Sequence, residues 1–210
     1  GQPYEFTTFS DAYNYKESEA KARAAERAEQ DKKDIPENFA KEIKAYHDKA
    51  PVKINGTKVL NFGENNLPFS YTVDYQMDGL VKKAGRNIVV SVGQLFGQQT
   101  HIEGKARKRD MDFFFRMIYD YPRSYSVTLN LNIPSGYSVA QESLQKLNNH
   151  IDNEALRLTT KAEISDGKLV IIFQKVYKQQ RVPVAKWEQV LSMLDRAYEF
   201  TSQQIILKKK

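Results

Sequence analysis

The most regular alternation of apolar and polar side chains lies between residues 125 and 133. A period of two places the apolar side chains on one face of an extended strand and the polar ones on the other. One face of the strand is therefore expected to be buried and the other exposed to solvent, which favours an antiparallel sheet. The pattern ends at a turn sequence, Pro134-Ser135-Gly136. The alternating residues are Val127, Thr128, Leu129, Asn130, Leu131, Asn132 and Ile133.

Further short runs of the same kind predict a sheet of several strands. Asn55-Gly56 reads either as a hairpin turn or as a bulge inside one strand over residues 52–61. Ser165-Asp166-Gly167 is a hairpin signal between two longer runs. Residues 169–173 are apolar on both faces, which indicates a central strand. The other predicted strands cover residues 69–76, 88–92, 156–164, 168–177 and 205–207.

Helical patterns flank the strands at both ends of the chain. Residues 16–33 are rich in alanine and in i,i+4 charge pairs, which predicts an exposed helix. Pro36 is expected to begin a second helix that ends at Pro51. A wide apolar stripe from Trp187 to Tyr198 predicts a last helix that docks on the sheet. Residues 138–153 are polar and are expected to form a loop.

These patterns together predict an α+β fold. It is mainly an antiparallel β-sandwich, with N-terminal helices and one C-terminal helix packed against it. Residues 1–50 form a helical connector segment in this interpretation, and residues 51–210 form the β-sandwich-like domain with its helix.

Composition narrows the classes of function. The 210 residues contain no cysteine, which excludes disulfides, a thiol nucleophile and thiolate zinc sites. The net charge of +6 permits an acidic partner without requiring one. No apolar run approaches the length of a membrane span, so no transmembrane segment is expected.

Candidate catalytic groups are sparse. His47, His101 and His150 are scattered, without the spacing of a zinc hydrolase. Asp110 and Asp112 follow three basic residues, which favours charged carboxylates over a protonated general acid. No nucleophile elbow, phosphate-binding loop or dinucleotide fingerprint occurs. The sequence therefore predicts a protein that is not an enzyme and that binds no cofactor or metal.

A basic cluster followed by aromatic residues is the best candidate binding patch. Most of the aromatic residues are expected to fill the core, because large apolar side chains are usually buried. Nucleic acid is disfavoured as a partner, because the basic cluster is short and two aspartates follow it. The candidate residues are Lys105, Arg107, Lys108, Arg109, Phe113 and Phe115.

The order of several segments carries a family resemblance. They are Leu67-Pro68-Phe69-Ser70-Tyr71, residues 84–90, residues 109–113, residues 125–133 with Pro134-Ser135-Gly136-Tyr137, residues 182–187 and residues 205–207. In this order they resemble the C-terminal, non-catalytic domain of unknown function that follows the transglutaminase-like core in multi-domain bacterial envelope proteins. Two positions depart from the pattern: Trp187 stands in place of tyrosine, and Ala140-Gln141 in place of proline.

The resemblance implies an exported protein, in the periplasm or on the cell surface. It implies an accessory or interaction module that contacts an upstream transglutaminase-like domain of the same polypeptide. It also favours one strand over residues 52–61. The Cys-His-Asp catalysis of that core cannot lie in a chain without cysteine. A β-sandwich that binds a glycan or another envelope polymer through exposed tyrosines is an alternative, as are a peptide-binding module and a basic nucleic-acid-binding domain.

Overall fold

The computed structural model describes residues 17–61, 70–114 and 123–210. The chain divides into two compact units, Gly1–Asp78 and Gly79–Lys210, each of which is described by itself. The sequence places the boundary at residue 50, whereas the contacts place it after Asp78. The first strands therefore belong with the N-terminal helix, because they pack on it.

The first unit is a helix packed on a two-stranded hairpin. It contains α2 (Glu17–His47), β1 (Lys53–Asn61) and β2 (Ser70–Gln76), and the two strands are antiparallel. Phe39 and Ile43 are buried, and the Phe39 ring lies 4.9 Å from the ring of Tyr71 on β2. Strand β1 is continuous, as the resemblance implied, with a register shift between Ile54 and Gly56.

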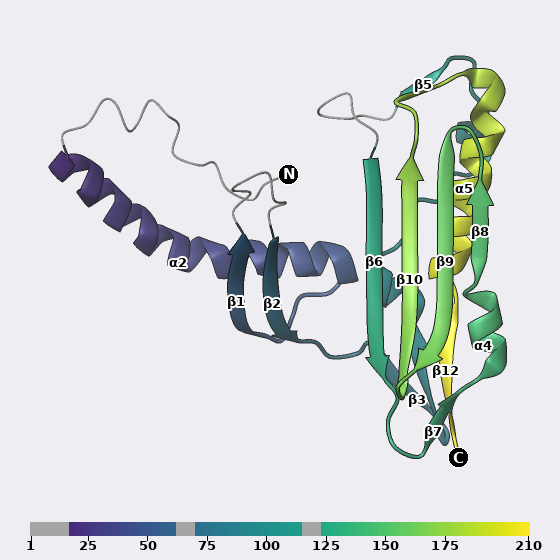
Figure 1. Cartoon of the computed structure of the whole chain (residues 1–210), viewed down its shortest axis with the longest axis horizontal. Helices are drawn as coiled ribbons and strands as arrows, with labels where there is room; N and C mark the ends of the chain where they lie inside the picture. Colours follow the sequence, from purple (N-terminus) through teal and green to yellow (C-terminus); the bar gives the residue numbers. More distant parts are fainter. Residues whose placement is uncertain (1–16, 62–69, 115–122) are drawn as a thin grey trace. The chain divides into compact units, whose positions relative to one another are not determined.

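Helix α2 runs through Pro36 without a break, as Figure 1 shows. The prediction of two helices was therefore wrong. A proline inside a helix removes one hydrogen bond and crowds the preceding turn. The apolar stripe after Pro36 packs on the hairpin, and this packing holds the second half of the helix in place.

The second unit is built on two four-stranded antiparallel sheets, and the predicted α+β class is confirmed (Figure 1). Strand β5 (Phe113–Phe114) pairs separately with β11 (Arg181–Val182). In spatial order, the first sheet contains β6 (Arg123–Asn132), β10 (Lys168–Tyr177), β9 (Leu156–Ser165) and β8 (Asn149–Asp152). The second contains β3 (Val81–Ala84), β4 (Asn87–Ser91), β12 (Gln204–Lys209) and β7 (Tyr137–Val139).

Helix α5 (Trp187–Thr201) carries the widest buried face of this unit. Its Phe200 ring lies 5.2 Å from Phe173 on β10 and 5.3 Å from Phe96 on the short helix α3 (Val92–Phe96). The predicted docking of this helix on the sheet is therefore confirmed. The shorter helices are α4 (Gln141–Lys146), η2 (Gly104–Arg107) and η3 (Val184–Lys186).

The hairpin between β9 and β10 follows its local turn sequence. Asp166 and Gly167 both have positive φ angles, 50° and 72°, as a two-residue primed turn requires. Strand β10 lies between β6 and β9, so its predicted central place is confirmed.

Residues 138–153 are not the predicted loop. They contain most of β7, all of α4 and the whole of β8. These elements are too short to show a periodic pattern, and burial of Leu144 and Leu147 in the core fixes them. Within the described residues, no helix has the length and apolar character needed to cross a membrane.

Candidate functional site

The predicted patch maps to the end of the second unit where β5 meets β11 and α5 begins. Asp112 holds these segments together. Its Oδ1 accepts a hydrogen bond from the Val184 backbone N–H at 2.9 Å, and its Oδ2 accepts one from Arg181 Nε at 2.7 Å. The backbone hydrogen bond from Val184, followed by the bond from Arg181, lowers the pKa of Asp112. We call this region the β5–β11 end.

Trp187, the first residue of α5, anchors the basic segment. Its side chain is only 4% exposed, and its Nε1 donates a hydrogen bond of 2.7 Å to the backbone oxygen of Arg107. The Phe113 ring lies 5.1 Å from the Trp187 ring. The Arg109 guanidinium lies over both rings, 4.5 Å from Phe113 and 4.4 Å from Trp187.

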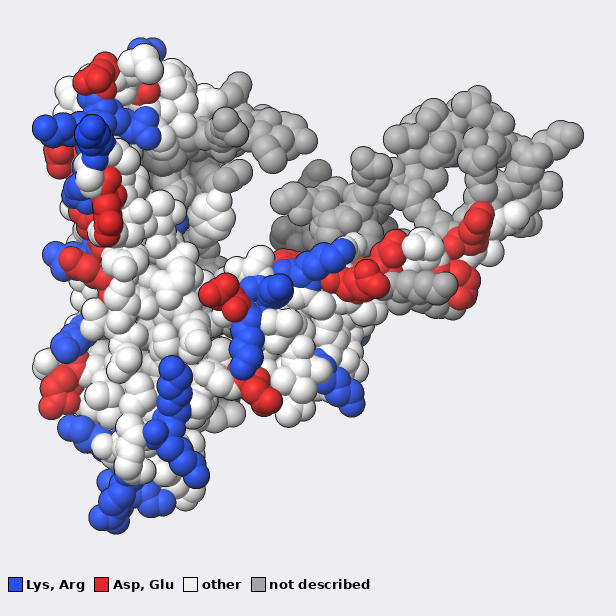
Figure 2. Space-filling view, turned by 180° about the vertical axis from the view of Figure 1, so that it is seen from behind, with Lys and Arg blue, Asp and Glu red and all other residues white. Residues whose placement is uncertain are grey.

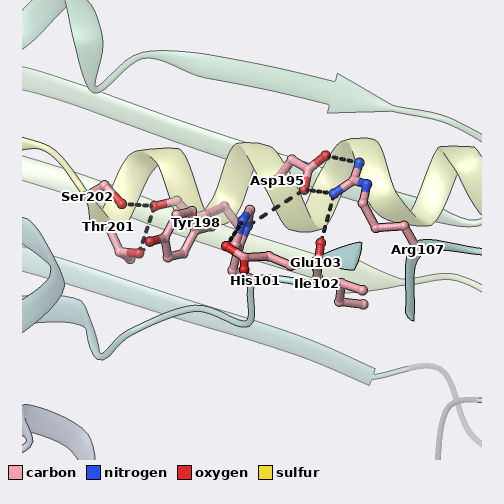
Figure 3. A network of polar contacts seen from close by, with 9 residues as sticks. His101, Ile102, Glu103, Arg107, Asp195, Tyr198, Thr201 and Ser202 are labelled. Atoms are coloured by element: carbon pink, nitrogen blue, oxygen red, sulfur yellow. Dashed lines mark hydrogen bonds and ion pairs between the residues drawn. The ribbon is translucent and has the colours of Figure 1, made fainter. Parts of the chain in front are cut away.

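Arg107 makes a two-pronged ion pair with Asp195 on α5, shown in Figure 3. The two N···O distances are 2.9 and 2.8 Å, and the same guanidinium donates to the backbone oxygen of Ile102 at 2.9 Å. The hydrogen bond from Arg107 lowers the pKa of Asp195. Next to this pair, the His101 ring stacks on Tyr198 at 4.3 Å.

The structure gives the predicted patch residues two different roles. Arg107 is held by Asp195, and Arg109 covers two aromatic rings, so both contribute to folding. Lys105 and Lys108 are exposed. Phe113 is partly buried and packs on the core, as the aromatic residues were expected to do. Phe115 lies outside the described residues.

Sequence reasoning missed the exposed apolar residues at this end. Met111 is 79% exposed, Phe114 is 58% exposed and Val184 is 40% exposed. Arg181 lies over the Phe114 ring, 5.7 Å from its centroid. Pairing of Arg181 with Phe114 brings these residues together from distant parts of the chain, and no local signal could have revealed it.

The two units carry opposite net charges. Residues 79–210 contain 21 lysine and arginine against 12 aspartate and glutamate residues, a net charge of +9. Residues 1–78 contain 11 against 14, a net charge of −3. Figure 2 shows basic side chains interspersed with acidic ones at the end of the second unit where β5 lies, and mainly basic ones at its opposite end. The net charge of the second unit as a whole is therefore compatible with an acidic partner.

Two partly buried tyrosines of the first unit have hydrogen-bond partners within it. Tyr71 Oη donates to Glu42 at 2.7 Å, and Tyr75 Oη lies 2.8 Å from His47 Nε2. Together with Phe39 and Tyr46, these residues line a hollow of about 200 Å³. His47 is buried, because the hairpin covers that end of α2.

The structure shows which carboxylates and possible metal ligands lie at the β5–β11 end. Among the described residues, no cluster of His, Asp or Glu is suited to hold a metal ion. The carboxylates at this end, Asp112 and Asp195, each accept hydrogen bonds from an arginine and are stabilised in the charged form. The exposed apolar side chains at this end are bordered by guanidinium and ammonium groups.

One family model matches part of the chain. Residues 122–195 match the A-macroglobulin receptor binding domain, which is less than half of the chain. The match covers β6 to β11 and includes Trp187 and Asp195, but not Arg107 or β5. Comparisons with curated proteins and with solved structures return no match. The second unit is thus similar, over this range, to a β-sandwich receptor-binding domain.

Proposed function

We propose that this chain is a non-catalytic interaction module, and that its second unit binds a partner protein through the β5–β11 end. The observation that carries the proposal is the exposure of Met111, Phe114 and Val184 on a rigid support. Large exposed apolar side chains bordered by polar groups are typical of protein interaction sites.

The support keeps these side chains in place without help from a partner. Asp112 ties β5 to β11 and to the residue after Pro183, and Trp187 ties the basic segment to α5. A surface that is ordered before binding loses less entropy when a partner docks. Met111 and Phe114 can therefore act as anchors, and the arginines beside them can orient the partner.

The partner on this proposal presents an apolar side chain beside carboxylates. Arg109 lies over two aromatic rings at the rim, and a guanidinium group can bind a carboxylate by paired hydrogen bonds, whereas Arg181 already donates to Asp112. The net charge of +9 on this unit adds long-range attraction for an acidic surface. The name of the matching family, a receptor-binding domain, supports an interaction role.

The finer assignment remains the one implied by the resemblance. In it, the chain is an accessory module of an exported bacterial protein with a transglutaminase-like domain. The comparisons contain no link to such a domain. An immunoblot of fractionated native cells tests it: a band much heavier than 24.2 kDa in the envelope fraction is expected, and a band near 24.2 kDa in the cytosol would contradict it.

Selection from a displayed peptide library tests the binding chemistry. The chain of residues 1–210 is expected to enrich peptides that combine acidic residues with a large apolar residue. A parallel selection with Phe114→Ser should lose this enrichment. Ile164→Ser is the matched control, because Ile164 is 51% exposed on β9, away from β5 and β11. Equal enrichment with both variants would contradict the proposal.

A further inference from the structure

Strand β6 lies at an edge of its sheet and lacks the usual protection of an edge. It pairs with β10 over ten consecutive residues with no register shift. Among the described strands, β10 alone pairs with β6. Between Ser124 and Asn132 the strand has no charged residue, proline or glycine. Long, flat, uncharged edges invite a further strand, and proteins usually avoid them.

The other described edges follow that rule. Strands β7 and β8 have three and four residues. Strand β3 has four residues, and two of them are lysines, Lys82 and Lys83. Strand β1 carries Lys53 and Lys58 and has two register shifts. Its partner β2 carries Asp74, and β5 and β11 have two residues each. Strand β6 is therefore the exception among the described strands, which suggests that its edge is used.

The backbone groups of β6 that do not bond to β10 can be assigned from this pairing. The N–H of Ile133 donates to Gly167 O at 3.1 Å, at the hairpin end of β10. Backbone groups point to opposite sides at successive residues of a strand. The odd-numbered residues of β6 therefore bond to β10, and the N–H and C=O of the even-numbered residues face the open edge. Thr128 is the middle one of these.

The sequence of β6 matches itself when it is paired antiparallel about Thr128. Val127 then faces Leu129 of the other strand, and Tyr125 faces Leu131. Ser126 faces Asn130 in the same way, and Ser124 faces Asn132. Every apolar residue meets an apolar one on the inner face, and every polar residue meets a polar one on the outer face. Cross-strand pairs of these kinds stabilise sheets.

We propose that a second copy of this chain binds to the open edge of β6, by antiparallel pairing about a two-fold axis at Thr128. The four-stranded sheet that contains β6 in one copy then continues into the same sheet of the other copy. Val127, Leu129 and Leu131 are only partly buried in one copy, and the added strand covers them further. A two-fold interface of this kind is closed, so assembly stops at the dimer.

The mass of the whole chain in solution tests this directly. Sedimentation of residues 1–210 over a range of concentrations should show a reversible dimer, twice the 24.2 kDa of one chain. The two-fold axis places position 128 opposite itself. Thr128→Lys or Thr128→Glu alone should therefore give a monomer, because like charges meet across the axis. Thr128→Ser is the matched control and should remain dimeric.

A mixture of the two charged variants distinguishes antiparallel pairing about Thr128 from other modes of dimerisation. Equal amounts of Thr128→Lys and Thr128→Glu should restore a dimer, because opposite charges then meet at the axis. Circular dichroism and thermal melting of each variant confirm that the side chain, on the wet face, leaves the fold intact. A wild-type chain that stays monomeric at every concentration overturns the proposal. So does a Thr128→Lys chain that dimerises like the wild type.

Discussion

Trp187 Nε1 donates a hydrogen bond of 2.7 Å to the backbone oxygen of Arg107, 80 residues earlier in the chain. This bond joins the start of the last helix to the basic segment that the sequence singled out. The same indole packs against Phe113 and lies under the Arg109 guanidinium. One buried side chain therefore organises the surface that is proposed to bind a partner.

Two substitutions of Trp187 should lower the stability of the second unit by different amounts. Trp187→Phe keeps most of the ring but leaves the Arg107 oxygen without this donor, which costs about 1–2 kcal/mol. Trp187→Ala also opens a cavity and should cost about 3–5 kcal/mol. Urea unfolding followed by circular dichroism measures both. Equal stability of the two variants would contradict the role of the ring in packing.

The ion pair between Arg107 and Asp195 should make stability depend on pH. The pKa of Asp195 is lower in the folded chain than its ordinary value of 3.8. Its charge therefore stabilises the fold above the ordinary value, and this contribution is lost as pH falls through the folded pKa. Asp195→Asn should be less stable than wild type at neutral pH. Thermal melting from pH 7 downward should show the difference shrinking below pH 4, and a constant difference would contradict the pairing.

Lys175 should also make stability rise with pH, here in the alkaline range. Its Nζ lies 5.6 Å from the ring centroid of Tyr125 and 5.6 Å from that of Tyr177, and it donates to Gln99 Oε1 at 2.7 Å. Burial lowers its pKa from the ordinary 10.5, so the unfolded chain holds the proton to a higher pH. Wild type should therefore gain stability relative to Lys175→Met as pH rises toward 10.5. Chemical denaturation at several pH values measures this, and a flat difference would contradict it.

Gly93 should tolerate no side chain. A Cβ at this position in α3 would lie 2.7 Å from the backbone oxygen of Thr201 and 2.5 Å from Gln98 Nε2. The glutamine can move, but the backbone of α5 cannot do so without disturbing the core. Gly93→Ala should therefore destabilise the second unit by about 1–3 kcal/mol. The control is Gly56→Ala, where a Cβ meets nothing within 4 Å.

The long strands and the last helix could be predicted because their patterns are strong. Alternation over residues 125–133 predicts β6, and the stripe from Trp187 predicts the buried face of α5. Strand β3 and helix α4 could not be predicted in this way, because four to six residues carry too little periodicity. Pro36 led to the wrong prediction of two helices. The packing of the residues after it outweighs the usual tendency of proline to end a helix.

The candidate site was located only in part. The basic cluster identified the segment, but the sequence could not show that Arg107 and Arg109 are engaged within the fold. Those contacts come from α5, far along the chain. The exposed apolar residues were missed for the same reason, because exposure depends on which segments pack together. Phe113 and Phe114 look alike in sequence, yet one packs on the core and the other is exposed.

The affinity of a selected acidic, apolar peptide for two variants tests the central claim most directly. Titration calorimetry should show binding to wild type and to Ile164→Ser with equal affinity. Phe114→Ser should bind at least about tenfold more weakly, since loss of an anchor residue at an interface costs about 2 kcal/mol or more. The melting temperature of Phe114→Ser should stay near that of wild type, because this side chain is exposed. Unchanged affinity of Phe114→Ser would contradict the claim that the β5–β11 end is the binding surface.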